Sequence, residues 1–117
     1  MTRDRQLDQL AQLARMLRDR ELNRLSVLAA RRQAARVQME DCREDRRRAL
    51  ASAAADPAHI AGADGPWLAW NVARHQKLSA SAALAAADVE AQLLIARRAF
   101  GRAEALGRIA ERKQQKR

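Results

Sequence analysis

Few side chains in this sequence have types and spacing suited to catalysis or metal binding. A metal site needs several His, Cys, Asp or Glu ligands that converge, and neither His59 nor His75 has a second histidine one helical turn away. Cys42 has no CxxC partner and belongs to an apolar stripe, so we expect it to be a small buried hydrophobe. The chain has no Gly-rich phosphate loop, GxSxG or HExxH motif. We therefore expect no metal, no cofactor and no enzymatic activity.

The first candidate binding residues are two tryptophans. Trp67 and Trp70 are three residues apart and so share one face of a helix. Because tryptophan is highly buried on average, the favoured interpretation is that the pair packs onto the first helix near Leu50. The alternative is an exposed aromatic anchor for a partner, flanked by Arg74 and His75.

The second candidate site is a set of arginines on the C-terminal helix. One interpretation is a solvated surface that pairs with acids of the first helix, and the other is a docking surface for an acidic partner. Nucleic acid stays open, because phosphate contacts need little more than spaced cations. Against it, the chain has no base-reading motif and few aromatic residues for stacking. The members are Arg97, Arg98, Arg102, Arg108 and Arg112.

Composition indicates a helical protein with a thin core. Ala, Arg, Leu, Glu and Gln dominate, strand formers are scarce, and the net charge is +9 with acids interleaved along most of the chain. A single cysteine suits a reducing cytoplasm, and the N-terminus does not predict a secretory signal. The most apolar run, from Ala80 to Ala87, ends at Asp88 and is expected to be too short to cross a bilayer.

Breakers predict the positions of the helices. Residues 4–55 contain no Pro or Gly and predict one long helix, residues 56–66 contain both prolines and predict a loop, and residues 67–115 predict a second helix. Asp64 could cap the second helix, and Pro66 suits its first turn. We therefore expect one all-α domain, residues 1–117, in which two long helices form an antiparallel coiled-coil hairpin.

Each helix carries a stripe with steps of three and four, which is typical of coiled coils. Two successive steps of four around Glu21 predict a stutter. The first stripe is Leu7, Leu10, Ala14, Leu17, Glu21, Leu25, Leu28, Arg32, Ala35, Met39, Cys42, Arg46, Ala49 and Ala53. The second is Leu78, Ala82, Ala85, Val89, Gln92, Ala96, Phe100, Ala103, Leu106 and Ala110.

A turn near Ala61 would define the register of the two helices. We then expect contacts of Leu17 with Leu106, Met39 with Leu84, Glu21 with Arg102, and Arg32 with Glu90. Opposite charges would meet where the stripes are polar, which favours the antiparallel arrangement.

The C-terminal part of the last helix includes residues 96–112, which read ARRAFGRAEALGRIAER. This segment, with the Leu-rich first helix, resembles FliJ-like proteins, flagellar export components with YscO-type relatives in type III secretion. The resemblance implies a coiled coil similar to the stalk of rotary ATPases, which binds the hexameric export ATPase, the cytoplasmic domain of the export gate and export chaperones. It also implies a cytoplasmic protein that is peripheral at the inner-membrane export apparatus.

Three functions remain open from the sequence. The first is a non-catalytic stalk or adaptor of a flagellar or type III export apparatus. The second is a basic helical protein that binds nucleic acid, and the third is a structural coiled coil that associates with itself. These alternatives predict, in turn, binding to an export ATPase, affinity for nucleic acid that falls steeply with salt, and self-association.

Overall fold

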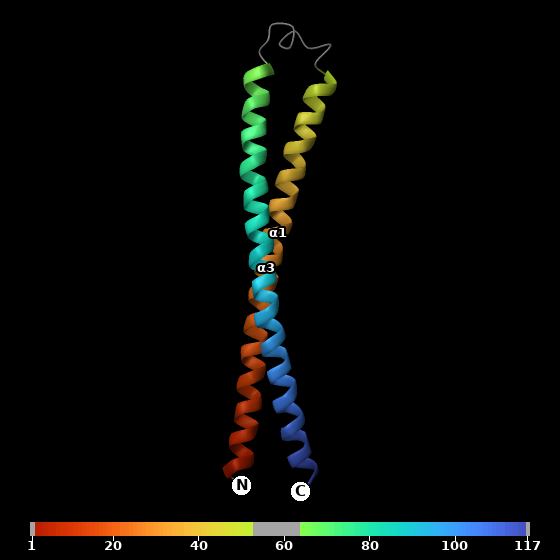
Figure 1. The fold of residues 1–117 in the computed structure, drawn as a ribbon. Helices are drawn as coiled ribbons and strands as arrows, with labels where there is room; N and C mark the ends of the chain where they lie inside the picture. Colours follow the sequence, from red (N-terminus) through yellow and green to blue (C-terminus); the bar gives the residue numbers. More distant parts are fainter. Residues whose placement is uncertain (1, 53–63, 117) are drawn as a thin grey trace. The chain divides into compact units, whose positions relative to one another are not determined.

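The computed structural model describes residues 2–52 and 64–116, and it confirms the expected fold class. Helix α1 spans Thr2–Ser52 and helix α3 spans Asp64–Gln115 (Figure 1). The protein is all-α, and its two long helices pair antiparallel as a coiled-coil hairpin. The expected end of the first helix at residue 55 and the loop at 56–63 lie outside the described residues.

Both helices begin slightly earlier than expected. Helix α1 begins at Thr2, two residues before the expected start, and α3 begins at Asp64, three residues before Trp67. Pro66 is compatible with this earlier start, because the first-turn N–H groups have no partner within a helix. Gly101 and Gly107 lie inside α3 and do not end it.

The chain divides into two compact units. The terminal unit comprises Met1–Ala29 and Asp88–Arg117, and the middle unit comprises Ala30–Ala87. In the terminal unit, Lys113 lies 3.8 Å from Asp4, so the first turns of α1 and the last turns of α3 are neighbours (Figure 1). In the middle unit, the Asn71 side-chain amide donates to the Cys42 carbonyl at 3.2 Å, again between α1 and α3.

Small residues line the contact between the helices, as the stripes predict. The buried side chains include Ala14 and Ala35 on α1 and Val89 and Ala103 on α3. Alanine lets two helix backbones approach closely because no long side chain holds them apart. We call this contact the alanine seam; its members are Ala11, Ala14, Ala35, Cys42, Val89, Ala96, Ala99, Ala103 and Ala110, with Glu21, Asn71 and Gln92 as its buried polar members.

Two large residues that the stripes place in the contact between the helices are exposed instead, so these two assignments are wrong. Leu10 is 52% exposed and Phe100 is 52% exposed, whereas their neighbours Ala11 and Ala99 are buried. Close helix approach selects the smaller residue of each adjacent pair for the seam. The buried positions of α1, which are Ala11, Ala14, Glu21, Ala35 and Cys42, fit one unbroken heptad pattern. In that pattern both Leu10 and Leu17 lie beside the seam, so the expected stutter at Glu21 is not needed.

The expected register is also wrong. The side-chain amide of Gln92 donates to the Glu21 carboxylate at 2.6 Å, whereas Arg102 was the expected partner. The observed partner lies ten residues before the expected one along α3. The expected register depends on a turn near Ala61, and that residue lies outside the described residues. Leu84 was expected to face Met39, but it is 66% exposed.

Helix α3 is also apolar enough to be considered as a membrane span. By length and composition alone, it contains a window with a mean hydropathy of 1.4. The expectation that the apolar run ending at Asp88 is too short to cross a bilayer stays a prediction. The same helix supplies Val89, Gln92 and Ala96 to the alanine seam. One helix of this kind is weak evidence for a membrane span.

Candidate functional site

The tryptophan pair belongs to the middle unit, where Trp67 is half-buried and Trp70 is exposed. The ring centroids of Trp67 and Trp70 are 6.4 Å apart, and Trp70 is 55% exposed. The Arg74 guanidinium lies 5.5 Å from the centre of the Trp70 ring, a cation–π contact, and 3.9 Å from Asp45. The favoured interpretation of a buried pair is wrong for Trp70, because the neighbouring Asn71 occupies the seam position.

The structure brings only part of the arginine set together. Arg98 and Arg102 line one groove of the terminal unit, and Arg20 of α1 lines it from the opposite side. Arg108 is exposed and pairs with Glu104 of its own helix at 2.7 Å. Arg97 and Arg112 are also exposed, but they do not line the grooves described below.

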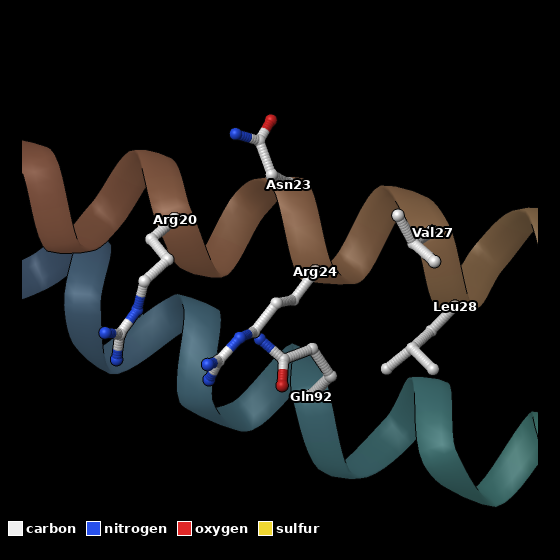
Figure 2. Close-up of a pocket in the computed structure, with 6 residues that line it drawn as sticks. All are labelled: Arg20, Asn23, Arg24, Val27, Leu28 and Gln92. Atoms are coloured by element: carbon white, nitrogen blue, oxygen red, sulfur yellow. The ribbon is translucent and has the colours of Figure 1, made fainter.

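Two adjoining grooves make up the candidate site. One is lined by Leu17, Arg20, Glu21, Ile95, Arg98, Ala99 and Arg102. The other has a volume of about 450 Å³ and is lined by Arg20, Asn23, Arg24, Val27, Leu28 and Gln92. Because they share Arg20, we treat them as one surface and call it the arginine groove. Figure 2 shows the Arg20 and Arg24 side chains extending from α1 toward α3, with Asn23 directed away.

A buried carboxylate holds two of these arginines in place. Oε1 of Glu21 accepts hydrogen bonds from Arg20 and Arg24, each at 3.3 Å, and Gln92 donates to Oε2 at 2.6 Å. Gln92 also donates to the Glu21 backbone carbonyl at 3.1 Å. The hydrogen bond from Gln92, assisted by Arg20 and Arg24, holds the pKa of the Glu21 carboxyl below its ordinary value of 4.5. Both arginine side chains stay more than half exposed, so their charge is positioned and still accessible.

Charge is segregated around the terminal unit. In heptad notation, with the seam at a and d, the arginines and most of the aliphatic residues of the groove fall at c and g on one flank. They are Leu17, Arg20, Arg24, Val27, Ile95, Arg98 and Arg102. From residue 91 onward, the c and g positions of α3 carry only Ala, Arg, Ile and Lys, and in α1 up to residue 29 they carry only Arg, Gln, Leu and Val. The acids of α3 in this unit lie elsewhere on the helix, apart from Asp88 at its boundary; they are Glu90, Glu104 and Glu111 at position b.

The groove also has an apolar lining. Ile95 is 46% exposed, and Val27 and Leu17 lie beside the arginines. Further along the same flank, Leu10 and Leu13 are exposed on α1 and Ile109 on α3. Within residues 2–52 and 64–116, no group of three or more His, Cys, Asp or Glu residues could hold a metal ion. The chemistry that this surface offers is non-covalent contact with apolar and anionic groups.

Sequence reasoning missed the α1 half of this site. It grouped the arginines of α3 by their nearness in the sequence and did not consider Arg20 and Arg24. The signal that identifies them is the heptad position, because c and g positions of both helices combine cations with Leu, Ile or Val. That signal requires the register, which the structure supplies through the pair of Glu21 and Gln92.

Comparisons with known proteins do not assign the chain to a family. No protein-family model, curated protein or solved structure matches it. What the protein does must then be inferred from its own residues.

Proposed function

We propose that this protein is a non-catalytic helical adaptor that binds other proteins. In line with its resemblance to FliJ-like proteins, we propose that it serves as the stalk or adaptor of a flagellar or related type III export apparatus. Its partners would be the export ATPase, the cytoplasmic domain of the export gate and export chaperones. It would act in the cytoplasm, peripheral to the inner membrane through those partners.

The observation that carries the proposal is an inverted distribution of apolar side chains. The alanine seam buries small residues, while the large ones stay outside. Exposed apolar side chains that lie together mark protein interaction sites in soluble proteins, and Leu17 and Ile95 line one groove here. The exposed large residues are Leu10, Leu13, Met16, Leu22 and Val27 with Leu94, Ile95, Phe100 and Ile109 in the terminal unit, and Val37, Leu50, Trp70, Val72 and Leu84 in the middle unit.

Nucleic acid explains this surface less well than protein does. Phosphate binding needs cations but gains nothing from exposed Leu and Ile side chains, and single-stranded bases stack on aromatic rings. The arginine groove has no aromatic residue in its lining. Its cations alternate with aliphatic side chains, a combination that favours an acidic protein surface.

The test is a pull-down with the tagged full-length chain, from a nuclease-treated lysate of cells that natively make the protein, at moderate salt. Recovery of an export ATPase or export-gate protein would support the proposal. Recovery of other specific proteins would retain the adaptor and refute the export assignment. If the partners are ribosomal or nucleoid proteins that nuclease removes, the chain binds nucleic acid and the proposal is wrong.

A further inference from the structure

The arginine groove combines three features that together specify a ligand. It runs between two helices, its lining includes Leu17, Val27 and Ile95, and its sides carry Arg20, Arg24, Arg98 and Arg102. The only carboxylate in the lining is that of Glu21, which is buried and already satisfied by Arg20, Arg24 and Gln92. Four guanidinium groups against one carboxylate leave the groove strongly positive.

We propose that the arginine groove binds one amphipathic helix of a partner protein, with an apolar stripe flanked by Asp or Glu residues. This inference rests on the proposed adaptor function and specifies the chemistry of its partner. A helix laid along the contact between two helices can bury its apolar stripe against both. Carboxylates on either side of that stripe would then reach the arginines, which can bind them in a bidentate manner.

The structure favours a helix of several turns. The apolar residues of this flank run from Leu10 to Val27 on α1 and from Ile95 to Ile109 on α3. The interval from Leu10 to Val27 is about 18 residues long. A partner helix that lies along it would have about the same number of residues, because both helices rise by about 1.5 Å per residue. Glu21 fixes the positions of Arg20 and Arg24 before the partner arrives, which lowers the conformational entropy lost on binding.

A second copy of the chain fits this groove poorly. If two copies met through the same flank, the arginines of one would face the arginines of the other. Like charges at an interface are a strong obstacle to association. The groove therefore calls for a partner of opposite charge, and the net charge of +9 acts in the same direction.

The probe is a fluorescein-labelled helical peptide of about 21 residues with Leu at its a and d positions and Glu on both flanks, measured by anisotropy at about 0.15 M salt. Two matched peptides replace every flanking Glu with Lys, or every Leu with Ser. A single-stranded DNA of about 20 nucleotides tests the competing class of ligand. We expect saturable binding of the Glu–Leu peptide alone to the full-length chain.

The variants separate the groove from the rest of the surface. R98E/R102E should weaken binding of the Glu–Leu peptide by about tenfold or more, while R97E/R108E, with the same change in charge, should change it by less than about twofold. Ile95→Ser should weaken binding, whereas Leu94→Ser, at an adjacent exposed position outside the groove lining, should not. R98E/R102E should also acquire affinity for the Lys–Leu peptide. Circular dichroism confirms that each variant stays helical.

Several outcomes would overturn the proposal. They are absence of saturable binding of the Glu–Leu peptide, equal losses in the groove and control variants, or DNA binding that the groove variants abolish. Repeating the lysate pull-down with R98E/R102E separates this proposal from the adaptor function. If the variant keeps every partner of the unaltered chain, the adaptor function stands and the groove assignment is wrong; if the unaltered chain captures no protein partner, the adaptor function itself fails.

Discussion

Gln92 of α3 donates its side-chain amide to the carboxylate of Glu21 on α1 at 2.6 Å, inside the alanine seam. The pair ties the two helices of the terminal unit in one register. A shift by one residue would separate the amide from the carboxylate and take from the buried carboxylate its shortest hydrogen bond, which is costly. The same carboxylate positions Arg20 and Arg24, so the register and the arginine groove depend on one residue.

The coupling between these two residues can be measured by a double-mutant cycle. Gln92→Ala should lower Tm, because the buried carboxylate loses its shortest hydrogen bond. Glu21→Ala should also lower Tm, because the Gln92 amide keeps only its hydrogen bond to the backbone carbonyl at position 21. The variant with both changes has alanine at both positions, like most of the seam, and leaves neither polar side chain buried. It should therefore unfold at a higher Tm than Gln92→Ala. Strictly additive losses, measured by thermal circular dichroism, would show that the pair does not act as a unit.

Acid should destabilise the fold. The Gln92 hydrogen bond lowers the pKa of Glu21 below 4.5, and hydrogen bonding to Arg47, with Arg48 nearby, lowers the pKa of Glu44 to about 2. When folding lowers the pKa of a carboxyl group, its charged form stabilises the folded state. This stability is fully present above the pKa of the unfolded state and is lost as the pH falls through the pKa of the folded state.

Tm should therefore fall between about pH 4.5 and about pH 2. Glu44→Gln should reduce this fall, and added salt should weaken the exposed Glu44 part of it. A Tm that stays constant or rises across this window contradicts the assignment.

Asn71 is the matching polar member of the middle unit. It is 1% exposed, its amide donates to the Cys42 carbonyl at 3.2 Å, and the Cys42 thiol donates to the Asn71 carbonyl at 3.6 Å. Asn71→Ala should lower the free energy of unfolding by about 1–3 kcal/mol, because a buried carbonyl loses its donor. Asn23→Ala, at an exposed position, serves as the control in urea denaturation; equal effects of the two changes would rule out the proposed role of Asn71.

Two glycines weaken α3 without an evident packing role. A methyl group added at Gly101 or Gly107 would meet no heavy atom within 4 Å, apart from its chain neighbours and the backbone of its own helix. Gly101→Ala and Gly107→Ala should each raise the free energy of unfolding by about 0.5–1 kcal/mol, because alanine restricts the unfolded chain and favours the helix. Ala105→Gly should have the opposite effect. Destabilisation by either alanine would show that the glycine has a role that the free space does not reveal.

The sequence predicts the fold well and the site only in part. Breakers and heptads identify both helices and most of the seam, including Glu21, Cys42, Val89 and Gln92, because these signals are local. The choice of Ala11 over Leu10, and of Ala99 over Phe100, depends on how closely the backbones approach. The groove depends on the register across two segments about 70 residues apart, as in the pair of Glu21 and Gln92. Arg20 and Arg24 were missed for that reason.

The central claim is that the exposed apolar surface serves a partner of another kind, and sedimentation of the purified full-length chain tests it most directly. Because arginines flank the groove and the net charge is +9, the chain should sediment as a 13.1 kDa monomer at about 0.15 M salt and tens of micromolar protein. A stable dimer or tetramer of the unaltered chain, in which Leu13 and Ile95 become protected from oxidative labelling, would contradict the claim. The exposed side chains would then be the interface of a self-assembling coiled coil.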